Sequence, residues 1–483
     1  MITRETRPVT PVDRILLRYA ALTLLLWPAV LRVSVAAPDG RIEAADAQPI
    51  AADCARDGRR LQRQAACAFG QDCYLVAWCD GTLQPDRPTA DIYAARIDPR
   101  SGRSLDPAGI RLCEAGDLQE RPAVAFDGRN FLVVWQDFRN GQDYDIYGAR
   151  VSRQGRVLDP DGFPIVCRAG NQARPAVAYA GGHYVVAWMD ARQYPVYGLY
   201  AARVAPTGQV LDPEGRAVDS EAPARIEKVL PQDKSWLGDR HYWWQGLSSR
   251  FQPSLTSNGT ACLVTWLRDV HANKTTGHVA LVDPVSLNIL GKPEQLSGEP
   301  RDRIAACPVP GGWAVAFDHW IAGWGYVARM AALRLDERGQ PREAIADRAD
   351  RKSLLPAAPL LDVQKALADR AGDYQQGKGH FAFWQAGLAP AGKQAVVVMD
   401  FGWRTPQKVN ELNYVVVASR LSIHDGRFLD DPPLVLAAGS MASGRCVRRP
   451  VVAAGVDDNL LVVYEEDMGI DRLGLEARLL RAK

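Results

Sequence analysis

The sequence has 483 residues, of which 47% are hydrophobic and 24% are charged, and these proportions exclude a disordered or collagen-like chain. Its 58 Lys and Arg residues nearly balance 56 Asp and Glu residues, so the net charge of +2 provides no global field to attract nucleic acid. The 13 Trp, 41 Gly and 32 Pro residues favour many short strands joined by tight turns.

The N-terminal segment has the pattern of an export signal. A basic region over residues 1–18 is followed by an apolar run over residues 19–31 and then by small residues up to Ala37. This order predicts a secretory signal peptide over residues 1–37, and the apolar run is shorter than the ~20 residues that span a bilayer. An uncleaved membrane anchor is the alternative. We therefore expect a secreted or periplasmic protein that is not stably inserted in a membrane after cleavage.

Two stretches of the chain repeat each other. Residues 121–162 and 174–215 align without a gap at an offset of 53 residues, and about half of the aligned positions are identical. Each stretch predicts a hairpin of two alternating strands, a third strand, and a fourth strand with a break at a Pro-Asp-Gly or Pro-Glu-Gly turn. Four antiparallel strands at a period of about 50 residues are typical of a β-propeller blade.

The same pattern continues along the chain and predicts an all-β fold, a single seven-bladed β-propeller of four-stranded antiparallel blades over residues 38–483. The expected blades cover approximately 61–119, 120–172, 173–249, 250–300, 301–364, 365–441, and 442–483 plus 40–51.

Each predicted second strand ends at a large side chain, and an acidic residue follows within three positions. The large residues are Trp78, Trp135, Trp188, Trp266, Phe317, Met399 and Tyr464. The acidic residues are Asp80, Asp137, Asp190, Asp269, Asp318, Asp400 and Asp467. An arginine ends most third strands, at Arg96, Arg150, Arg203, Arg334, Arg420 and Arg478.

The two ends of the propeller region complement each other. The last repeat stops after its third strand, and residues 40–51 resemble the fourth-strand region that begins at Gly155. We therefore expect the N-terminal strand to complete the last blade, which closes the ring and removes two open sheet edges.

The motifs P-A-V-A-F-D-G, D-F-R-N-G and D-I-Y-G at 122–148 resemble the repeats of TolB-like propellers. The W-x-D-x-R, D-I-Y-G-x-R and L-D pattern is similar to repeats of uncharacterised bacterial secreted proteins, and the likeness is strongest in the second and third blades. The resemblance implies a propeller outside the cytoplasm. It implies no activity, because propellers host unrelated functions.

The repeated residues favour structural roles. A Trp at the same place in each blade is suited to fill the contact between neighbouring blades, although a ring of ligand-stacking aromatics is the alternative. The repeated Asp and Arg predict a bridge between the loop after the second strand and the third strand, with a catalytic role as the alternative.

Residues that depart from the repeats are the candidates for ligand binding. An insertion at 220–249 and the loops of the fifth and sixth blades are rich in aromatic side chains, which stack on sugars or anchor protein partners. A lid over the central channel is the alternative for the insertion. The candidate binding residues are Trp236, His241, Tyr242, Trp243, Trp244, His319, Trp320, Trp324, Trp403 and Arg404.

Known catalytic signatures are absent from the sequence, including metalloprotease, nucleophile-elbow, phosphate-loop and dinucleotide-binding motifs. The sequence therefore favours a non-catalytic, monomeric binding or scaffold module for a protein or polysaccharide, with no nucleic-acid partner. The alternative is a glycan-active enzyme of glycosidase or lyase type with acid–base carboxylates on the same face. The candidate carboxylates are Asp233, Asp239, Glu465, Glu466 and Asp467.

No cofactor is expected. His271 and His278 share a loop but lack further recognisable zinc ligands, and the acidic stretch at 137–145 offers oxygen ligands for a structural Ca²⁺ without an EF-hand pattern.

Nine cysteines leave at least one thiol unpaired. The pairs Cys67–Cys73 and Cys54–Cys446 are candidate disulfides, with free thiols as the alternative. Cys113 and Cys167 lie a blade apart, too far to bridge.

Overall fold

The computed structural model describes most of the chain beyond the predicted signal peptide, and residues 1–37 lie outside the described residues. Residues 42–483 form one compact unit. In the described part, no helix is long and apolar enough to cross a membrane. The described residues are 42–51, 61–82, 89–194, 196–220, 249–271, 274–296, 304–320, 328–342, 344–346, 354–356, 381–405, 408–424, 427–430, 433–440, 443–467 and 473–482.

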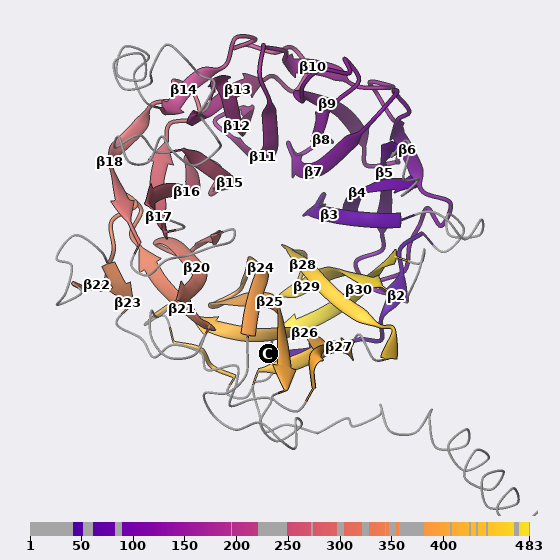
Figure 1. The fold of residues 1–483 in the computed structure, drawn as a ribbon, viewed down its shortest axis with the longest axis vertical. Helices are drawn as coiled ribbons and strands as arrows, with labels where there is room; N and C mark the ends of the chain where they lie inside the picture. Colours follow the sequence, from indigo (N-terminus) through magenta and orange to yellow (C-terminus); the bar gives the residue numbers. More distant parts are fainter. Residues whose placement is uncertain are drawn as a thin grey trace, which may run out of the picture. The chain divides into compact units, whose positions relative to one another are not determined.

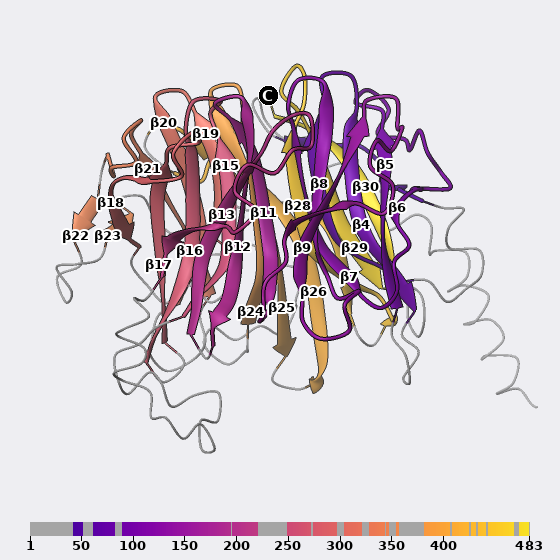
Figure 2. The same cartoon turned by 90° about the horizontal axis from the view of Figure 1, so that it is seen from above.

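The strands form antiparallel sheets arranged radially around a central axis (Figures 1 and 2). Four separate sheets have four strands each. The first two are β7 (Gln119–Phe126), β8 (Asn130–Asp137), β9 (Asp145–Ser152) and β10 (Phe163–Val166), and β11 (Gln172–Ala180), β12 (His183–Gln193), β13 (Val196–Val204) and β14 (Arg216–Asp219). The other two are β15 (Arg250–Ser257), β16 (Cys262–His271), β17 (Lys274–Val282) and β18 (Ile289–Gln295), and β24 (Phe381–Ala391), β25 (Gln394–Thr405), β26 (Lys408–Ser422) and β27 (Leu434–Ser440).

A nine-stranded sheet joins the two ends of the chain. It contains β28 (Cys446–Ala454), β29 (Asn459–Asp467), β30 (Leu473–Ala482), β3 (Leu61–Phe69), β4 (Tyr74–Thr82), β5 (Thr89–Ile97) and β6 (Ile110–Cys113), with β1 (Ile42–Ala44) and β2 (Gln48–Pro49) paired to β30. The remaining described strands form a three-stranded and a two-stranded sheet: β19 (Ala305–Val309), β20 (Gly312–Trp320) and β21 (Ala328–Leu335), and β22 (Ala344–Ala346) with β23 (Leu354–Pro356).

This arrangement confirms the predicted all-β propeller, but the sheets differ from seven separate four-stranded blades. Hydrogen bonding among the described residues gives five sheets of four or more strands. One reason is a single parallel pairing, Leu61 with Leu473, which merges two groups of strands into the nine-stranded sheet. Another is that the β19–β21 sheet has three strands in the described part.

The predicted closing strand is confirmed at the N-terminal end of the described chain. Residues of β1 pair antiparallel with the end of β30, from Ile42 opposite Ala482 to Ala44 opposite Leu480. Downstream, Gln48 lies opposite Ala477. Burial of the Ile42 and Ile50 side chains anchors the segment, because apolar area is removed from water at both ends of it.

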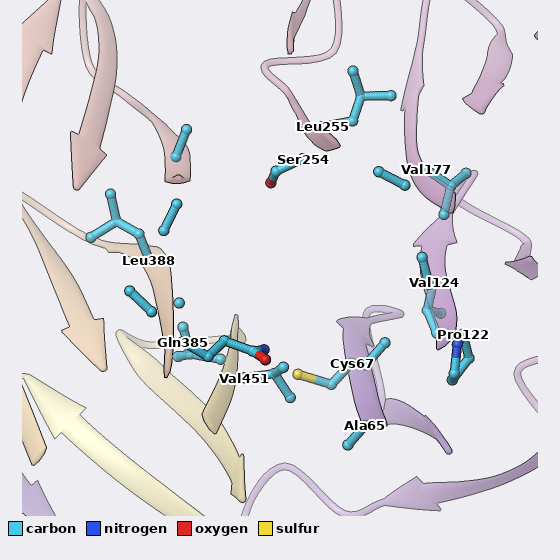
Figure 3. Close-up of a pocket in the computed structure, with 18 of the residues that line it drawn as sticks. Ala65, Cys67, Pro122, Val124, Val177, Ser254, Leu255, Gln385, Leu388 and Val451 are labelled. Carbon is cyan, nitrogen blue, oxygen red and sulfur yellow. The ribbon is translucent and has the colours of Figure 1, made fainter. Parts of the chain in front are cut away.

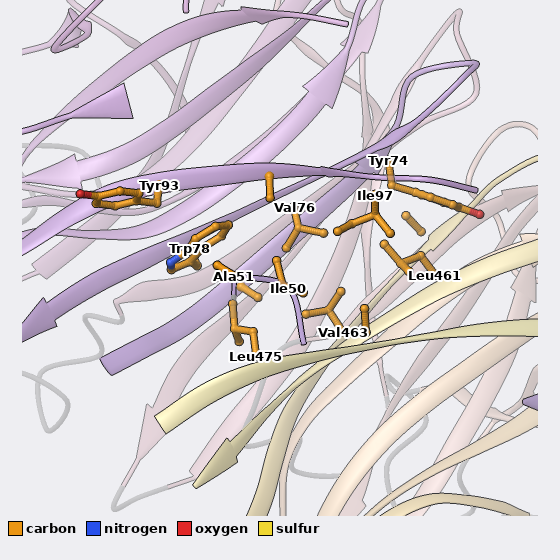
Figure 4. Packing of buried hydrophobic residues seen from close by; sticks show 14 of the residues in the cluster. Ile50, Ala51, Tyr74, Val76, Trp78, Tyr93, Ile97, Leu461, Val463 and Leu475 are labelled. Atoms are coloured by element: carbon orange, nitrogen blue, oxygen red, sulfur yellow. The ribbon is translucent and has the colours of Figure 1, made fainter. Parts of the chain in front are cut away.

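The Trp residues at the second-strand ends pack between neighbouring sheets, as predicted. Trp78, Trp135, Trp188 and Trp266 are almost completely buried. Figure 4 shows Trp78 of β4 in a cluster with Ile50 and with Leu475 of β30. In three of the four, the indole Nε1 donates a hydrogen bond to the Asp two positions later, at 3.3 Å in β4, 2.8 Å in β8 and 2.9 Å in β12. In Trp266, Nε1 donates to Asp219 instead.

The prediction of one Asp–Arg bridge between the second-strand end and the third strand is wrong, because two separate ion pairs occupy β7–β10 and likewise β11–β14. Asp137 pairs with Arg139 at 2.7 Å, within its own loop. The third-strand residue Arg150 pairs at 2.8 Å with Asp159, which lies directly before the Pro-Asp-Gly break that precedes the fourth strand. Equivalent third-strand pairs are Arg96–Asp106, Arg203–Asp212 and Arg420–Asp430.

The predicted disulfide between Cys67 and Cys73 is also wrong. Both are free thiols, because the hairpin register places Cys67 opposite Val76 and leaves Cys73 beyond the turn. Cys446 is free as well, and its predicted partner Cys54 lies outside the described residues.

Candidate functional site: the central channel and its collar

A cavity of about 180 Å³ lies on the central axis, between the innermost strands (Figure 3). Its walls are mostly small apolar residues contributed by β3, β7, β11, β15, β19, β24 and β28. The lining residues include Ala65, Cys67, Pro122, Val124, Pro175, Val177, Leu255, Ala306, Leu388 and Val451.

Two polar side chains also line the cavity, those of Ser254 and Gln385. Figure 3 shows the Ser254 hydroxyl and the Gln385 amide directed toward the space between the strands. Burial raises the pKa of the Cys67 thiol to about 12, so this wall residue is a neutral thiol at physiological pH. Among the described lining residues, therefore, no side chain is charged.

The innermost strands share a local distortion at one end of the cavity. In β3, β7, β11, β15 and β28, the register shifts directly before the lining residues, which is the mark of a β-bulge. At each bulge a non-glycine residue has a left-handed φ between 51° and 57°. These residues are Gln64, Arg121, Arg174, Gln252 and Arg449.

The bulges turn backbone N–H groups toward side-chain acceptors of adjacent strands. The N–H of Gln64 donates to Glu465 at 2.7 Å, and that of Arg174 donates to Gln136 at 3.0 Å. Asp400 accepts from two bulges, from Gln385 at 2.7 Å and from Arg449 at 2.6 Å. Because buried backbone donors need acceptors, these side chains stabilise the distorted backbone.

The N–H of the Arg121 bulge has an acceptor at a different position from that of the Arg174 bulge. Cys79 follows Trp78 at the position that Gln136 occupies after Trp135, and a thiol is a weak acceptor. The Gln64 side chain supplies the oxygen instead, accepting from the N–H of Arg121 at 2.9 Å.

We call the bulge residues and their charged neighbours the collar, because they surround one end of the cavity. Glu465 is fully buried and accepts from Arg448 at 3.1 Å and from Arg449 at 3.3 Å. Arg63 pairs with Glu120 at 3.2 Å. The collar comprises Arg63, Gln64, Glu120, Arg121, Gln136, Arg174, Gln252, Asp400, Arg448, Arg449 and Glu465.

Glu120 has further partners within the collar. Its Oε2 accepts from the Tyr144 hydroxyl at 3.0 Å and from Gln136 at 3.4 Å. Burial, together with the Glu120 carboxylate, raises the pKa of Tyr144 to about 12. Tyr144 is therefore a neutral hydrogen-bond donor at physiological pH, and the Glu120 carboxylate is engaged on both oxygens.

The predicted column of acidic residues separates into two kinds of site. Asp80, Asp137 and Asp190 lie two positions after the Trp and bind its indole. Asp400 follows Met399 directly, so it faces the opposite side of its strand and binds bulges instead. In β29 the carboxylate at this position is Glu465, one residue after Tyr464.

Most predicted ligand-binding residues lie outside the described residues, so they stay predictions. This applies to Trp236, His241, Tyr242, Trp243 and Trp244 in the insertion, and to Trp324. The backbones of His319 and Trp320 end β20, and those of Trp403 and Arg404 lie near the end of β25. These four residues were expected in loops, but they lie in second strands that extend beyond the predicted ends at Phe317 and Met399. Their side chains are outside the described part of the structure, so their binding role stays a prediction.

The histidine and acidic-loop candidates for metals have other partners. His278 stacks on Trp266 with ring centroids 5.5 Å apart, and burial lowers its pKa to about 4. In the 137–145 loop, Asn140 donates to both Asp143 and Asp145. No group of three His, Cys, Asp or Glu side chains suited to a metal occurs among the described residues.

The collar was missed in the sequence, although a signal for it was present. Gln252-Pro, Arg121-Pro, Arg174-Pro and Arg449-Pro recur at the starts of innermost strands. Helical backbone is disfavoured before Pro, and a left-handed non-glycine residue is uncommon, so the repeated dipeptide marks a special backbone position without revealing its geometry.

No family model matches the chain, and no curated protein matches it. Several solved structures are similar at low identity. A protein of unknown function from Dyadobacter fermentans is 11% identical with a TM-score of 0.45, over 92% of this chain and 99% of that one. An α-L-arabinofuranosidase from Fusarium graminearum is 10% identical with a TM-score of 0.43, over 88% and 94%. A subtype N10 neuraminidase-like protein of A/little yellow-shouldered bat is 9% identical with a TM-score of 0.37, over 91% and 99%. These likenesses assign no family or activity to the chain.

Proposed function

We propose that this chain is an exported, non-catalytic β-propeller that binds a protein or a polysaccharide through the face on which its second strands end. The observation that supports a binding role is the state of the carboxylates beside the channel. Glu120, Asp400 and Glu465 are each held by guanidinium groups, hydroxyls or backbone N–H groups.

A general acid or base must present an oxygen to the substrate, and these three carboxylates are poorly suited to do so. Asp400 and Glu465 are completely buried. Among the described residues of the cavity wall, Ser254 and Gln385 are the only ones with an amide or hydroxyl side chain, and no lining side chain is a carboxylate. An opposed pair of carboxylates across a pocket, which glycoside hydrolysis commonly uses, is not among the described lining residues.

We also propose seven blades for the ring. Seven innermost strands contribute to the cavity wall, which supports this number. In this interpretation the nine-stranded sheet contains two blades, and β1 with β2 supplies the outer strand of the last one. The resemblance to TolB-like and secreted bacterial repeats, the signal peptide at 1–37, the secreted or periplasmic location and the monomeric state belong to the same proposal.

The alternative is a glycan-active enzyme whose acid and base lie on the same face. Its candidates Asp233 and Asp239 lie outside the described residues. Glu466, another candidate, accepts a hydrogen bond from Arg445.

The proposal is tested with the protein comprising residues 38–483. A glycan array and polysaccharide pulldown should reveal a bound ligand without release of reducing ends or unsaturated products. A Trp243→Ala, Trp244→Ala variant should lose binding, because aromatic anchors dominate such interfaces. Leu105→Ala is the matched control, since Leu105 is an exposed apolar residue before the fourth strand. Product release would favour the enzyme, and unchanged binding by the double variant would remove the insertion as the site.

A further inference from the structure

We propose that the collar and the channel together bind a carboxylate that carries a short apolar group. The carboxylate belongs either to a free small organic acid or to the C-terminal residue of a polypeptide. This inference rests on the proposed binding function and gives it a ligand chemistry and a location.

The collar carries more positive than negative charge. Its described residues include the guanidinium groups of Arg63, Arg121, Arg174, Arg448 and Arg449, against three carboxylates. All five arginines are partly exposed. An anionic group at this end of the channel would therefore meet a local excess of positive charge, even though the whole chain is nearly neutral.

The arginines are also contiguous around the ring. They lie at the bulges of β28, β3, β7 and β11, directly before lining residues such as Pro122, Pro175 and Val451. The same position in β15 holds Gln252, and Asp400 lies at the bulges of β24 and β28. The positive groups thus form an arc on one side of the channel end.

Arginine suits a carboxylate because its planar fork donates paired hydrogen bonds to two oxygens. One guanidinium N–H of the collar has no acceptor among the described residues, although Glu120 occupies another N–H of the same group. The buried Nε of Arg63 has no hydrogen-bond acceptor in the described part of the chain. Burial alone would lower the pKa of Arg63, but Cys79, Glu120 and Glu465 raise it above its usual value, so the group keeps its charge.

The channel supplies the second half of the site. Its volume of about 180 Å³ is similar to that of an apolar protein cavity of ~150 Å³ that binds benzene. The apolar wall begins one residue beyond the bulges, so an apolar group that enters the channel leaves its carboxylate at the arginines.

The test is calorimetric titration of the protein comprising residues 38–483 with matched probes. These are 4-methylpentanoate, acetate, 4-methylpentan-1-ol, and the peptide acetyl-Gly-Gly-Leu as the free acid and as the C-terminal amide. We expect 4-methylpentanoate or the peptide acid to bind at least about tenfold more tightly than the alcohol and the amide, because these two lack the carboxylate that accepts charge-assisted hydrogen bonds. We expect the same margin over acetate, because acetate lacks the apolar group that enters the channel. The comparison between 4-methylpentanoate and the peptide acid distinguishes the two sources of the carboxylate.

The chain itself supplies the matched variants. Gln64 and Gln252 occupy the same left-handed bulge position as the arginines, so Arg121→Gln and Arg174→Gln should preserve the backbone. Together they should weaken the tighter probe at least about tenfold. Ser254→Leu should weaken it by filling the channel. Arg156→Gln removes the same charge from an exposed turn away from the collar and should leave binding unchanged.

Three results would overturn the inference: no binding of either acid, equal binding of acid and amide, or equal loss in Arg156→Gln and the double variant. Thermal melts identify a variant that has not folded. If Arg121→Gln does not fold, Arg121→Lys takes its place, because it keeps the positive charge and removes the planar fork that donates paired hydrogen bonds. If the glycan array is positive and collar variants leave it unchanged, this inference fails while the proposed function stands. If both acids bind but Trp243→Ala, Trp244→Ala has no effect, the collar stands and the insertion is removed as the site.

Discussion

The strands β7–β10 and β11–β14 differ from β24–β27 and β28–β30 in the position of one acidic residue, which is shifted by one place along the second strand. In the first pair, the acidic residue lies two positions after a Trp and binds its indole. In the second pair, the residue at the Trp position is Met399 or Tyr464, and the carboxylate follows directly. Because successive side chains of a strand face opposite sides, Asp400 and Glu465 reach the bulges of neighbouring strands.

The comparison separates two uses of the same scaffold. In β7–β14, the buried Asp, its Arg and the Trp stabilise the contact between sheets. In β24–β30, the carboxylates hold the backbone and the arginines beside the channel. The regular repeats therefore carry the contact between sheets and supply Arg121 and Arg174 to the collar, and the one-residue shift adds the buried carboxylates Asp400 and Glu465 to it.

The largest expected effect tests the role of the buried Asp in stabilising the contact between sheets in β7–β14. Asp137→Ala should lower the free energy of unfolding by about 3–5 kcal/mol, because it removes a fully buried carboxylate and leaves Arg139 and the Trp135 indole without their partner. Urea unfolding followed by Trp fluorescence measures this change. Asp159→Ala, which breaks the partly exposed pair with Arg150, should cost only about 1 kcal/mol. Equal losses would show that the two ion pairs do not differ as their burial indicates.

The next effect tests the second use. Asp400→Asn should cost about 1–3 kcal/mol, because the amide places a donor against one of the two backbone N–H groups that the carboxylate accepts. It should also weaken binding of the carboxylate probe, whereas Asp137→Ala should not. Calorimetric titration of both variants at a temperature where each is folded makes the comparison. Loss of binding in Asp137→Ala but not in Asp400→Asn would contradict the interpretation that the acidic residues of β24–β30 support the binding site and those of β7–β14 support the sheet contact.

The smallest effect concerns Glu476, which lies opposite Tyr464 on the neighbouring strand. In the regular sheet β7–β10, the equivalent pair is Tyr147 opposite Trp135. Burial, with a contribution from Glu466, raises the pKa of Glu476 to about 7. The folded state therefore holds the Glu476 proton more tightly than the unfolded chain. The contribution of this proton to the free energy of unfolding is fully present below about pH 4.5 and is lost as the pH rises through about 7.

Glu476→Gln should remove this dependence and make the protein about 1–2 kcal/mol more stable at pH 8, after allowance for solvent screening of a partly exposed group. Unfolding midpoints measured from pH 5 to 8 test it, with Glu43→Gln as an exposed control on β1. A parallel pH profile for wild type and Glu476→Gln would contradict the expectation.

The sequence predicted those features that depend on period and repetition. Alternating residues around Trp135 and Trp188 predicted the hairpins, and the likeness of residues 40–51 to a fourth-strand region predicted the pairing of β1 with β30. The ion pairs were misassigned because Asp137 has two arginines nearby in sequence, Arg139 and Arg150, and spacing alone does not choose between them.

The collar was beyond this kind of reasoning. It depends on the left-handed φ of Arg121 and Arg174 and on contacts between adjacent sheets, such as that of Glu465 with the N–H of Gln64. These residues are 401 positions apart, and a repeat pattern gives no information about a contact that differs from one blade to the next.

The pairing of β1 with the last residues of β30 has a consequence for biosynthesis. Ile42 is synthesised long before its partner Ala482. A chain that is truncated within β30 would leave the apolar residues around Ile42 and Ile50 uncovered and one sheet edge unpaired. Closure of the ring therefore depends on the synthesis of β30, and products truncated within this strand should be selectively exposed to proteases.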